Sequence, residues 1–369
     1  MRVLVVDVGM GTSDILLHDD SRRGENQTHL VVPSATRVVA AEIRAATRRG
    51  LPVVLRGRLM GGGPSSSAMD AHRAEGLAFY AEPDAARTFS DDLSEVASMG
   101  VVLVGEDEAE SLAAGGAVVV RSGDVRVDDL MRALALLGET EPLDGLGVAV
   151  QDHGEAPAGV SDRVFRFEKL VESLESSRRL TDLFYVLGSI PAHFTRLQAA
   201  GRCMVEGLGG SPALGLGDTV PVVVGDTVPV VVGDTGPAAL LGAALFRGAP
   251  CVVINYGNGH TLMAVVRDGE IDGLFEHHTG RLDRTSMANY ATEFLAGRLE
   301  SAQVLADGGH GVLPVSAAVE PGSLDVLVTG PNRARFAGVT EREVETSIHG
   351  SMMITGCYGL LEGFRARMS

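Results

Sequence analysis

The chain begins with a short apolar segment that ends at an aspartate and runs directly into a glycine-rich turn. Residues 1–18 read MRVLVVDVGMGTSDILLH. The apolar run before Asp7 predicts a buried strand, and the run from Ile15 predicts a second strand after the turn. Glycines remove Cβ atoms where backbone N–H groups must approach a phosphate closely. The stretch predicts either a phosphate-binding hairpin with Asp7 beside a metal ion, or an ordinary glycine-rich hairpin.

A second stretch in the other half of the chain repeats this layout. Residues 251–266 read CVVINYGNGHTLMAVV, an apolar strand followed by a glycine turn and another apolar strand. Aligning the two stretches sets residues 7–12, DVGMGT, against residues 255–260, NYGNGH. Two matching units, one in each half, predict two similar domains that each present a turn to a shared cleft.

Length, charge and cysteine usage limit the alternatives. A chain of 369 residues is long enough for two domains with buried cores. The net charge of −17 argues against binding to nucleic acid or anionic membranes, so an anionic ligand needs local N–H groups and Mg²⁺. Three widely spaced cysteines are typical of a reducing compartment. The N-terminus does not predict a signal peptide, and Asp226 and Asp234 interrupt the apolar region 220–246, so we expect a cytoplasmic protein without a membrane span.

The middle of the chain carries an insertion, a duplication and a polar strand end. Short strands and helices alternate over residues 57–140, which predicts a subdomain inserted into the first domain. GDTVPVVV occurs twice, at 217–224 and 225–232, so either copy could supply a strand while the other forms a loop. GDTG at 233–236 then opens a helix of small residues. Residues 151–154, QDHG, follow a predicted strand at its C-terminal end, where open α/β sheets place ligands.

Together these segments resemble the actin-like ATPase superfamily of sugar kinases, heat-shock chaperones and actin, in which the two turns are called phosphate 1 and phosphate 2. The resemblance implies an α/β protein with two lobes, each a mixed ribonuclease H-like sheet flanked by helices. It implies a first lobe over 1–235, a second over 236–345, and a C-terminal helix over 346–369 that returns to the first lobe. It also implies that ATP or ADP binds with Mg²⁺ in the cleft between the lobes.

Six motifs are similar, over nearly the whole chain, to a prokaryotic family labelled as pyruvate formate-lyase activating enzymes: DVGMGTSDILL, GDTGPAALLGA, NYGNGHT, FEHHTG, DGGHG and MITGCYGLL. An activating enzyme of that type is a radical S-adenosylmethionine protein, which needs three closely spaced cysteines for an iron–sulfur cluster. Cys203, Cys251 and Cys357 are 48 and 106 residues apart. The label is therefore compatible only with an ATP-dependent accessory that acts on a partner enzyme.

The residues and the resemblance assign candidate roles. The phosphate-binding candidates are Gly9, Gly11, Thr12, Ser13, Gly257, Asn258 and Gly259, and Gly330 and Asn332 are expected beside the nucleoside. The metal candidates are Asp7, Asp14 and Asp234, and the catalytic candidates are Asp152, to polarise a water or hydroxyl, and Asp7. The candidate substrate pocket comprises Gln151, His153, Glu276, His277, His278, Thr279 and His310.

Three classes of function remain open on the sequence alone. The first is an ATPase or phosphotransferase, and the second is a non-catalytic module that binds a nucleotide or phosphorylated ligand. Asn255 stands where phosphate 2 usually begins with aspartate, and its amide lacks the charge that attracts Mg²⁺ or accepts a proton. The third is a metal-dependent hydrolase, if the loops converge that carry Asp152, His153, His260, His277, His278, Asp307 and His310. The sequence does not identify the phosphoryl acceptor, a partner protein or the oligomeric state.

Overall fold

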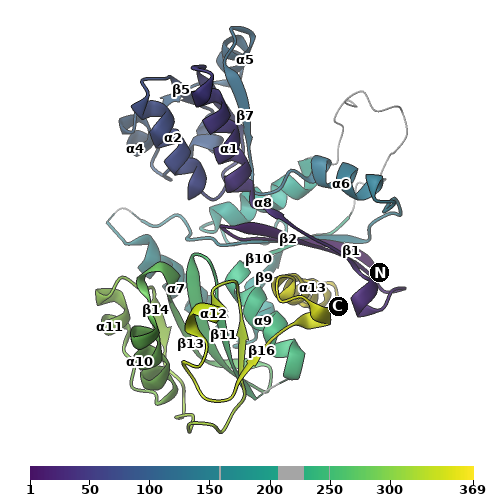
Figure 1. Cartoon of the computed structure of the whole chain (residues 1–369), viewed down its shortest axis with the longest axis vertical. Coiled ribbons are helices and arrows are strands. Elements are labelled where there is room, and N and C mark those ends of the chain that lie inside the picture. The colour runs from purple at the N-terminus through teal and green to yellow at the C-terminus, as the bar shows by residue number, and fades with distance from the viewer. Residues whose placement is uncertain (158, 207–227, 249) are drawn as a thin grey trace.

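The computed structural model describes residues 1–157, 159–206, 228–248 and 250–369, and its described part contains two six-stranded sheets (Figure 1). The first sheet has the order β3-β2-β1-β8-β10-β9. Its strands are β1 (Arg2–Val8), β2 (Thr12–Asp19), β3 (Thr28–Pro33), β8 (Gly145–Val150), β9 (Phe184–Val186) and β10 (Val230–Gly233). The second sheet has the order β14-β13-β12-β11-β15-β16. Its strands are β11 (Cys251–Tyr256), β12 (His260–Arg267), β13 (Glu270–His278), β14 (Gly311–Leu313), β15 (Val326–Thr329) and β16 (Glu343–Glu345).

The two sheets share one plan. In the first lobe, β1, β2 and β3 are antiparallel neighbours, β8 is parallel to β1, and β10 is parallel to β8. In the second lobe, β11, β12 and β13 are antiparallel, β15 is parallel to β11, and β16 is parallel to β15. Five strands of each lobe therefore have the same order and direction. The prediction of an α/β protein with two mixed sheets flanked by helices in an actin-like arrangement is confirmed.

A third, parallel sheet forms a separate subdomain, which Figure 1 shows at the top of the molecule. It consists of β4 (Val53–Gly57), β5 (Phe79–Ala81), β6 (Val102–Leu103) and β7 (Val118–Ser122), with α1 (Ala35–Arg48), α2 (Pro64–Ala74), α3 (Pro83–Ala86), α4 (Leu93–Ser98) and α5 (Glu106–Ala114). The expected bounds of 57–140 need correction at both ends. Ile43 of α1 and Val53 of β4 belong to the subdomain core, whereas Met131 of α6 (Val127–Leu136) packs into the core of the first lobe.

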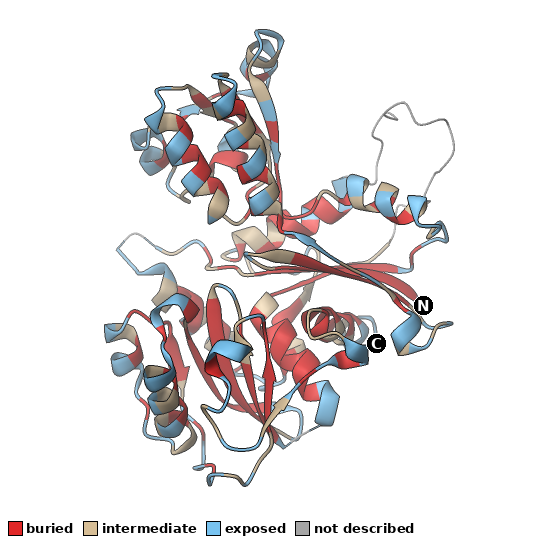
Figure 2. Ribbon diagram, viewed as in Figure 1, coloured by how far each residue is buried: buried red, intermediate tan, exposed pale blue. Residues whose placement is uncertain are grey.

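Two helices of small residues lie between the lobe sheets. Helix α9 (Thr235–Arg247) packs on β11, β12 and β15, and α13 (Thr355–Met368) packs on β1, β8 and β10. The two helices also pack on each other, and both are largely buried (Figure 2). A Cβ atom on Gly359 would lie 1.9 Å from the carbonyl oxygen of Ala238, and one on Gly242 would lie 1.9 Å from that of Thr355. Only glycine at these positions allows the helices to approach so closely.

We expect Gly359→Ala to lower the free energy of unfolding by about 1 to 3 kcal/mol, because the added methyl group must push the two helix backbones apart. This loss should exceed the gain that alanine ordinarily brings to a helix interior. Thermal unfolding followed by circular dichroism measures the change. Gly105→Ala is the matched control, since a Cβ atom there meets no atom within 4 Å. Equal stability of the two variants would show that the contact between the helices is not tight.

Of the remaining helices, the one at Asp162–Ser173 packs into the core between the lobe sheets through Phe167 and Leu170, and the others cover the outer faces of the sheets. Together they are α7 (Asp162–Ser173), α8 (Thr195–Glu206), α10 (Arg284–Leu295), α11 (Ser301–Ala306) and α12 (Arg333–Phe336), with short 3₁₀ turns at Gly24–Asn26, Leu180–Leu183, Thr279–Arg281 and Ile348–Gly350. Strand β10 comes from the second GDTVPVVV copy and the glycine after it, while residues 217–227, including the first copy, lie outside the described residues. Within the described ranges, no helix has both the length and the apolar character that crossing a membrane requires.

Candidate functional site in the cleft between the lobes

The two glycine turns close in the same way. In the first lobe, the Gly9 N–H donates to the Thr12 carbonyl oxygen at 2.9 Å. In the second lobe, the Gly257 N–H donates to the His260 carbonyl oxygen at 3.0 Å. Each turn joins the first two strands of its sheet, so the two turns occupy equivalent places in the two lobes.

The turns meet across the cleft. A Cβ atom on Gly11 would lie 2.5 Å from the side-chain nitrogen of Asn258, so the two turns are in direct contact. A narrow cavity of about 110 Å³ lies beside this contact. Nine of the predicted residues line it: Asp7, Gly9, Thr12, Asp14, Gln151, Gly257, Asn258, Gly259 and Gly330. Asn332 lies just behind, where its side chain donates to the Gly257 carbonyl oxygen at 2.9 Å.

Asp7 and Asp14 form a pair of buried carboxylates in this cavity. The two residues are directly opposite each other in β1 and β2, which places their side chains on the same face of the sheet. Burial, and then the neighbouring Asp14, raise the pKa of Asp7 to about 8. Burial likewise raises the pKa of Asp14 to about 7. A Cβ atom on Gly356 would lie 1.9 Å from Asp7 Oδ2, so the start of α13 covers this carboxylate.

This pair fits a hard divalent cation. The Oδ1 atoms of Asp7 and Asp14 are buried, and neither has a hydrogen-bond partner among the described residues. Buried carboxylate oxygens without partners are unfavourable unless a proton or a cation compensates their charge. Mg²⁺ is commonly held by one or two carboxylates together with phosphate oxygens. The donor set of Asp7 and Asp14 therefore suits Mg²⁺ that also contacts a phosphorylated ligand.

Asp234 has a different environment from the other two metal candidates. It caps α9 by accepting from the Gly236 N–H at 3.0 Å, and it forms an ion pair with Arg166 at 2.6 Å. Burial is the largest influence on its pKa and opposes ionisation. The charge and hydrogen bonds of Arg166, together with the backbone N–H groups of Asp152 and Gly236, outweigh burial and hold the pKa of Asp234 below its usual value. Both of its oxygens are thus occupied by protein donors. We therefore do not include Asp234 in the proposed metal site.

Arg166 of α7 is the centre of a buried charged network that joins the lobes. Its Nε atom lies 3.0 Å from Glu276 Oε1 in β13, and its Nη1 atom lies 2.6 Å from Asp234 Oδ2 at the end of β10. The Arg166 residue is only 2% exposed, and Glu276 is fully buried. Burial raises the pKa of Glu276, although Arg166 partly opposes that shift. Glu276, predicted for a substrate pocket, is instead part of this network.

Asp152 is held by backbone donors. Its Oδ1 atom accepts from the Gly154 N–H at 2.7 Å, and its Oδ2 atom accepts from the Leu197 N–H at 2.8 Å. Burial raises the pKa of Asp152 to about 6. A carboxylate that already accepts two backbone hydrogen bonds has less capacity to act as a base, and these bonds give Asp152 a clear structural role in fixing the start of α8.

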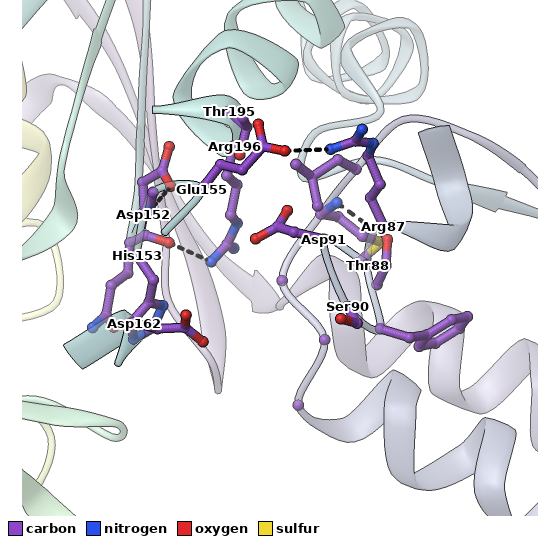
Figure 3. Close-up of a pocket in the computed structure, with 18 of the residues that line it drawn as sticks. Arg87, Thr88, Ser90, Asp91, Asp152, His153, Glu155, Asp162, Thr195 and Arg196 are labelled. Atoms are coloured by element: carbon purple, nitrogen blue, oxygen red, sulfur yellow. Dashed lines mark hydrogen bonds and ion pairs between the residues drawn. The ribbon is translucent and has the colours of Figure 1, made fainter. Parts of the chain in front are cut away.

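A wider cavity of about 1060 Å³ extends from the narrow one toward the subdomain. Figure 3 shows Asp152, His153 and Arg196 on one side and Arg87, Thr88 and Ser90 of the subdomain on the other. Arg196 donates to both oxygens of Asp124, at 2.7 and 2.9 Å, and to the Gln151 carbonyl oxygen at 2.7 Å. Gly9, Thr235 and His260 line both cavities, so the two spaces adjoin at the first turn.

Four histidines converge where the two cavities meet. The register of β12 and β13 places His260 opposite His278, with ring centres 4.6 Å apart. His310 follows α11, and its backbone N–H donates to the Glu276 carbonyl oxygen, which brings its ring 4.6 Å from that of His260. His153 reaches the group from the first lobe, with its ring 5.6 Å from His260. Burial lowers the pKa of His153 to about 3 and also lowers that of His260 and of His310.

The other predicted residues lie outside both cavities. Ser13 is buried within β2 and lines neither cavity, so we leave it out of the proposed phosphate site. Gly11 also lines neither cavity, but it contacts Asn258 at the edge of the narrow one. His277 faces away from the histidine group, as alternation along a strand requires, and its Nε2 atom lies 3.6 Å from Asp307. The Thr279 hydroxyl is 3.0 Å from that of Thr261 and is also buried.

Sequence reasoning missed three residues of the site: Arg166, Arg196 and Thr235. Of the three, only Arg166 could have been found from the sequence. It stands between Phe165 and Phe167 in an amphipathic helix, and these apolar neighbours are buried, which indicates that the arginine is buried too. Arg196 has no comparable pattern around it. Thr235 lines both cavities, and its side chain partly offsets the raised pKa of Asp7, but the sequence shows it only as the residue after a helix cap.

Comparison with known families identifies the chain. The model of a family described as "Putative pyruvate format-lyase activating enzyme (DUF1786)" matches residues 60–335, which is more than half of the chain. The chain belongs to this family. Its three cysteines are all buried and free, and no metal-binding group among the described residues includes one. The family member therefore lacks the cysteine arrangement that a radical S-adenosylmethionine cluster requires.

Solved structures provide weaker matches, and a search of curated proteins found none. The ethanolamine utilization protein EutJ from Carboxydothermus hydrogenoformans aligns with 12% identity over 98% of this chain and 89% of its own, with a TM-score of 0.31. AlfA from the B. subtilis plasmid pLS32, solved as a filament, aligns with 10% identity over 98% of both chains, with a TM-score of 0.39. Scores of this size do not establish a shared fold, so the two-lobed architecture is assigned from the strand orders above.

Proposed function

We propose that this family member binds ATP or ADP together with Mg²⁺ in the narrow cavity between its lobes. The observation that carries the proposal is the buried pair of Asp7 and Asp14. Both residues line a cavity shared by the two glycine turns, and their Oδ1 atoms have no hydrogen-bond partner in the described part of the chain. Backbone N–H groups of two turns and a carboxylate-bound cation are together suited to a polyphosphate.

In this proposal, residues of both lobes contact the nucleotide. Gly9, Gly11 and Thr12 would hold phosphate oxygens from the first lobe, and Gly257, Asn258 and Gly259 from the second. Gly330 and Asn332 would border the adenosine, beside Met352, which also lines the cavity. Mg²⁺ held by Asp7 and Asp14 would neutralise the phosphate charge.

Nucleotide entry requires the lobes to separate. The cavity of about 110 Å³ is smaller than the roughly 300 to 1,000 Å³ of typical ligand pockets. The contact between Gly11 and Asn258 closes it on one side. Nucleotide binding would thus hold the two lobes further apart. The packed helices α9 and α13 join the lobes, so a hinge between the lobes would lie at these helices. Such a change of shape would let the protein act on a partner enzyme as an accessory.

Binding with slow turnover fits the residues better than rapid hydrolysis. Asn255 contributes no charge at phosphate 2, and both oxygens of Asp152 already accept backbone hydrogen bonds. Among the described residues, those of the second lobe that line the narrow cavity therefore include no carboxylate that could orient a water molecule or hold Mg²⁺ for fast ATP hydrolysis.

Isothermal titration of ATP and ADP into chelated protein, with and without Mg²⁺, tests the proposal. We expect micromolar binding that depends on Mg²⁺, and ATP hydrolysis measured on the same preparation should be slow. Binding that is unaffected by Mg²⁺ would remove Asp7 and Asp14 from the site. No binding at millimolar nucleotide would overturn the proposal as a whole.

A further inference from the structure

We propose that His153, His260 and His310 form a binding site for one borderline divalent transition metal ion, such as Zn²⁺ or Co²⁺, that joins the two lobes. One ring nitrogen from each residue lies within 4.8 Å of the other two. In tetrahedral coordination with metal–nitrogen bonds of about 2.1 Å, ligand nitrogens are about 3.4 Å apart. Side-chain rotations that shorten these distances by up to about 1.4 Å would complete the site.

The buried rings have the properties of metal ligands. His310 is 1% exposed, and neither of its ring nitrogens has a hydrogen-bond partner among the described residues. An imidazole buried without partners is unfavourable in a protein interior, and a metal ion would satisfy the nitrogen that faces His153 and His260. Imidazole nitrogen is a common ligand of Zn²⁺ and Co²⁺.

The surroundings supply both charge balance and orientation. The Arg166 guanidinium lies close to the rings, but the carboxylates of Asp234 and Glu276 more than compensate its charge. The Gln151 amide nitrogen contacts the His260 ring at Nδ1. Rotating the amide by 180° would place its oxygen there, where it would accept from the Nδ1–H group and direct Nε2 to the ion. Histidines that bind metals usually have such a second partner.

The three ligands come from both lobes, so the bound ion would bridge the lobes. His153 follows β8 of the first lobe, while His260 begins β12 and His310 precedes β14 of the second. His153 and His260 also line the wide cavity. Three histidine ligands leave a fourth position for water or a substrate oxygen, as in catalytic zinc sites. The site shares none of the proposed Mg²⁺ ligands, so its occupancy can be measured on protein without nucleotide.

Titration of Co²⁺ into chelated protein, followed by visible absorption, tests the site. The wild-type chain should bind about one Co²⁺ with the strong absorption of a four- or five-coordinate ion. His310→Ala and His153→Ala should abolish this signal, and Gln151→Ala should weaken binding about tenfold. His29→Gln, which changes an exposed histidine of β3, should bind as the wild type does.

The outcomes separate this site from the nucleotide site. Asp7→Asn should keep the Co²⁺ signal even as it loses Mg²⁺-dependent nucleotide binding. His153 lies on a loop and is only partly buried, so its variant remains informative if His310→Ala fails to fold. Wild-type protein without a stoichiometric Co²⁺ signal, or a His153→Ala variant with an unchanged one, would overturn the proposal.

Discussion

Replacing Arg166 by methionine should lower the free energy of unfolding by about 3 to 5 kcal/mol. Methionine fills a similar volume but leaves Asp234 and Glu276 close together, buried and without their shared counter-charge. Removing one partner from a buried ion pair is costly because the remaining charge cannot be hydrated. Chemical denaturation at neutral pH measures the loss.

Two further variants separate the network from a general effect of helix α7. Lys169→Met changes a surface ion pair with Glu172 on the same helix and should alter stability by less than about 1 kcal/mol. The triple variant Arg166→Met, Asp234→Asn and Glu276→Gln should recover part of the stability, since no uncompensated charge remains. If Arg166→Met were as stable as Lys169→Met, the network would not hold the lobes together.

Asp7→Asn should abolish Mg²⁺-dependent nucleotide binding and, in chelated protein, make stability less sensitive to pH. The folded protein holds Asp7 and Asp14 protonated up to pKa values of about 8 and 7, whereas the ordinary value is 3.8. The folded state therefore binds more protons than the unfolded state between these values, and stability must fall as the pH rises through that window. In the wild type, each of the two carboxyl groups should contribute a loss of about 1.4 kcal/mol per pH unit over the part of this window that lies below its own pKa in the folded state.

Thermal unfolding across this pH range, with and without Mg²⁺, measures the effect. Mg²⁺ should restore stability to the wild type near pH 8, because it replaces the protons on the carboxylates, and should not do so for Asp7→Asn. Asp268→Asn, in an exposed turn of the second lobe, is the control and should behave as the wild type. Equal pH profiles for Asp7→Asn and Asp268→Asn would contradict the assigned carboxylate pair.

Local patterns in the sequence were enough to predict the elements that carry the two turns. The apolar runs on either side of residues 7–12 and 255–260 correctly predicted β1, β2, β11 and β12. A strand that is buried on both faces is recognisable as a continuous apolar run, without reference to the rest of the fold. The two turns were predicted from the pairs of glycines that separate these apolar runs. The repeated unit then predicted two equivalent lobes, and the shared strand order confirmed them.

Features that depend on tertiary packing could not be predicted from local sequence patterns. The periodicity of α1 predicts a helix but not the sheet on which it packs, so the start of the subdomain was placed too late. Asp234 is acidic and follows a strand, as a metal ligand would, but its partner Arg166 is 68 residues away in sequence. The convergence of His153, His260 and His310 likewise requires two lobes and three separate strand ends to come together.

The most direct test of the central claim is a crystal structure of the protein grown with Mg²⁺ and a non-hydrolysable ATP analogue. The account predicts that the phosphates lie between the turn at Gly9 and the turn at Gly257, and that the metal ion contacts Asp7 and Asp14. A nucleotide bound to one lobe only, or a metal ion away from both carboxylates, would contradict it.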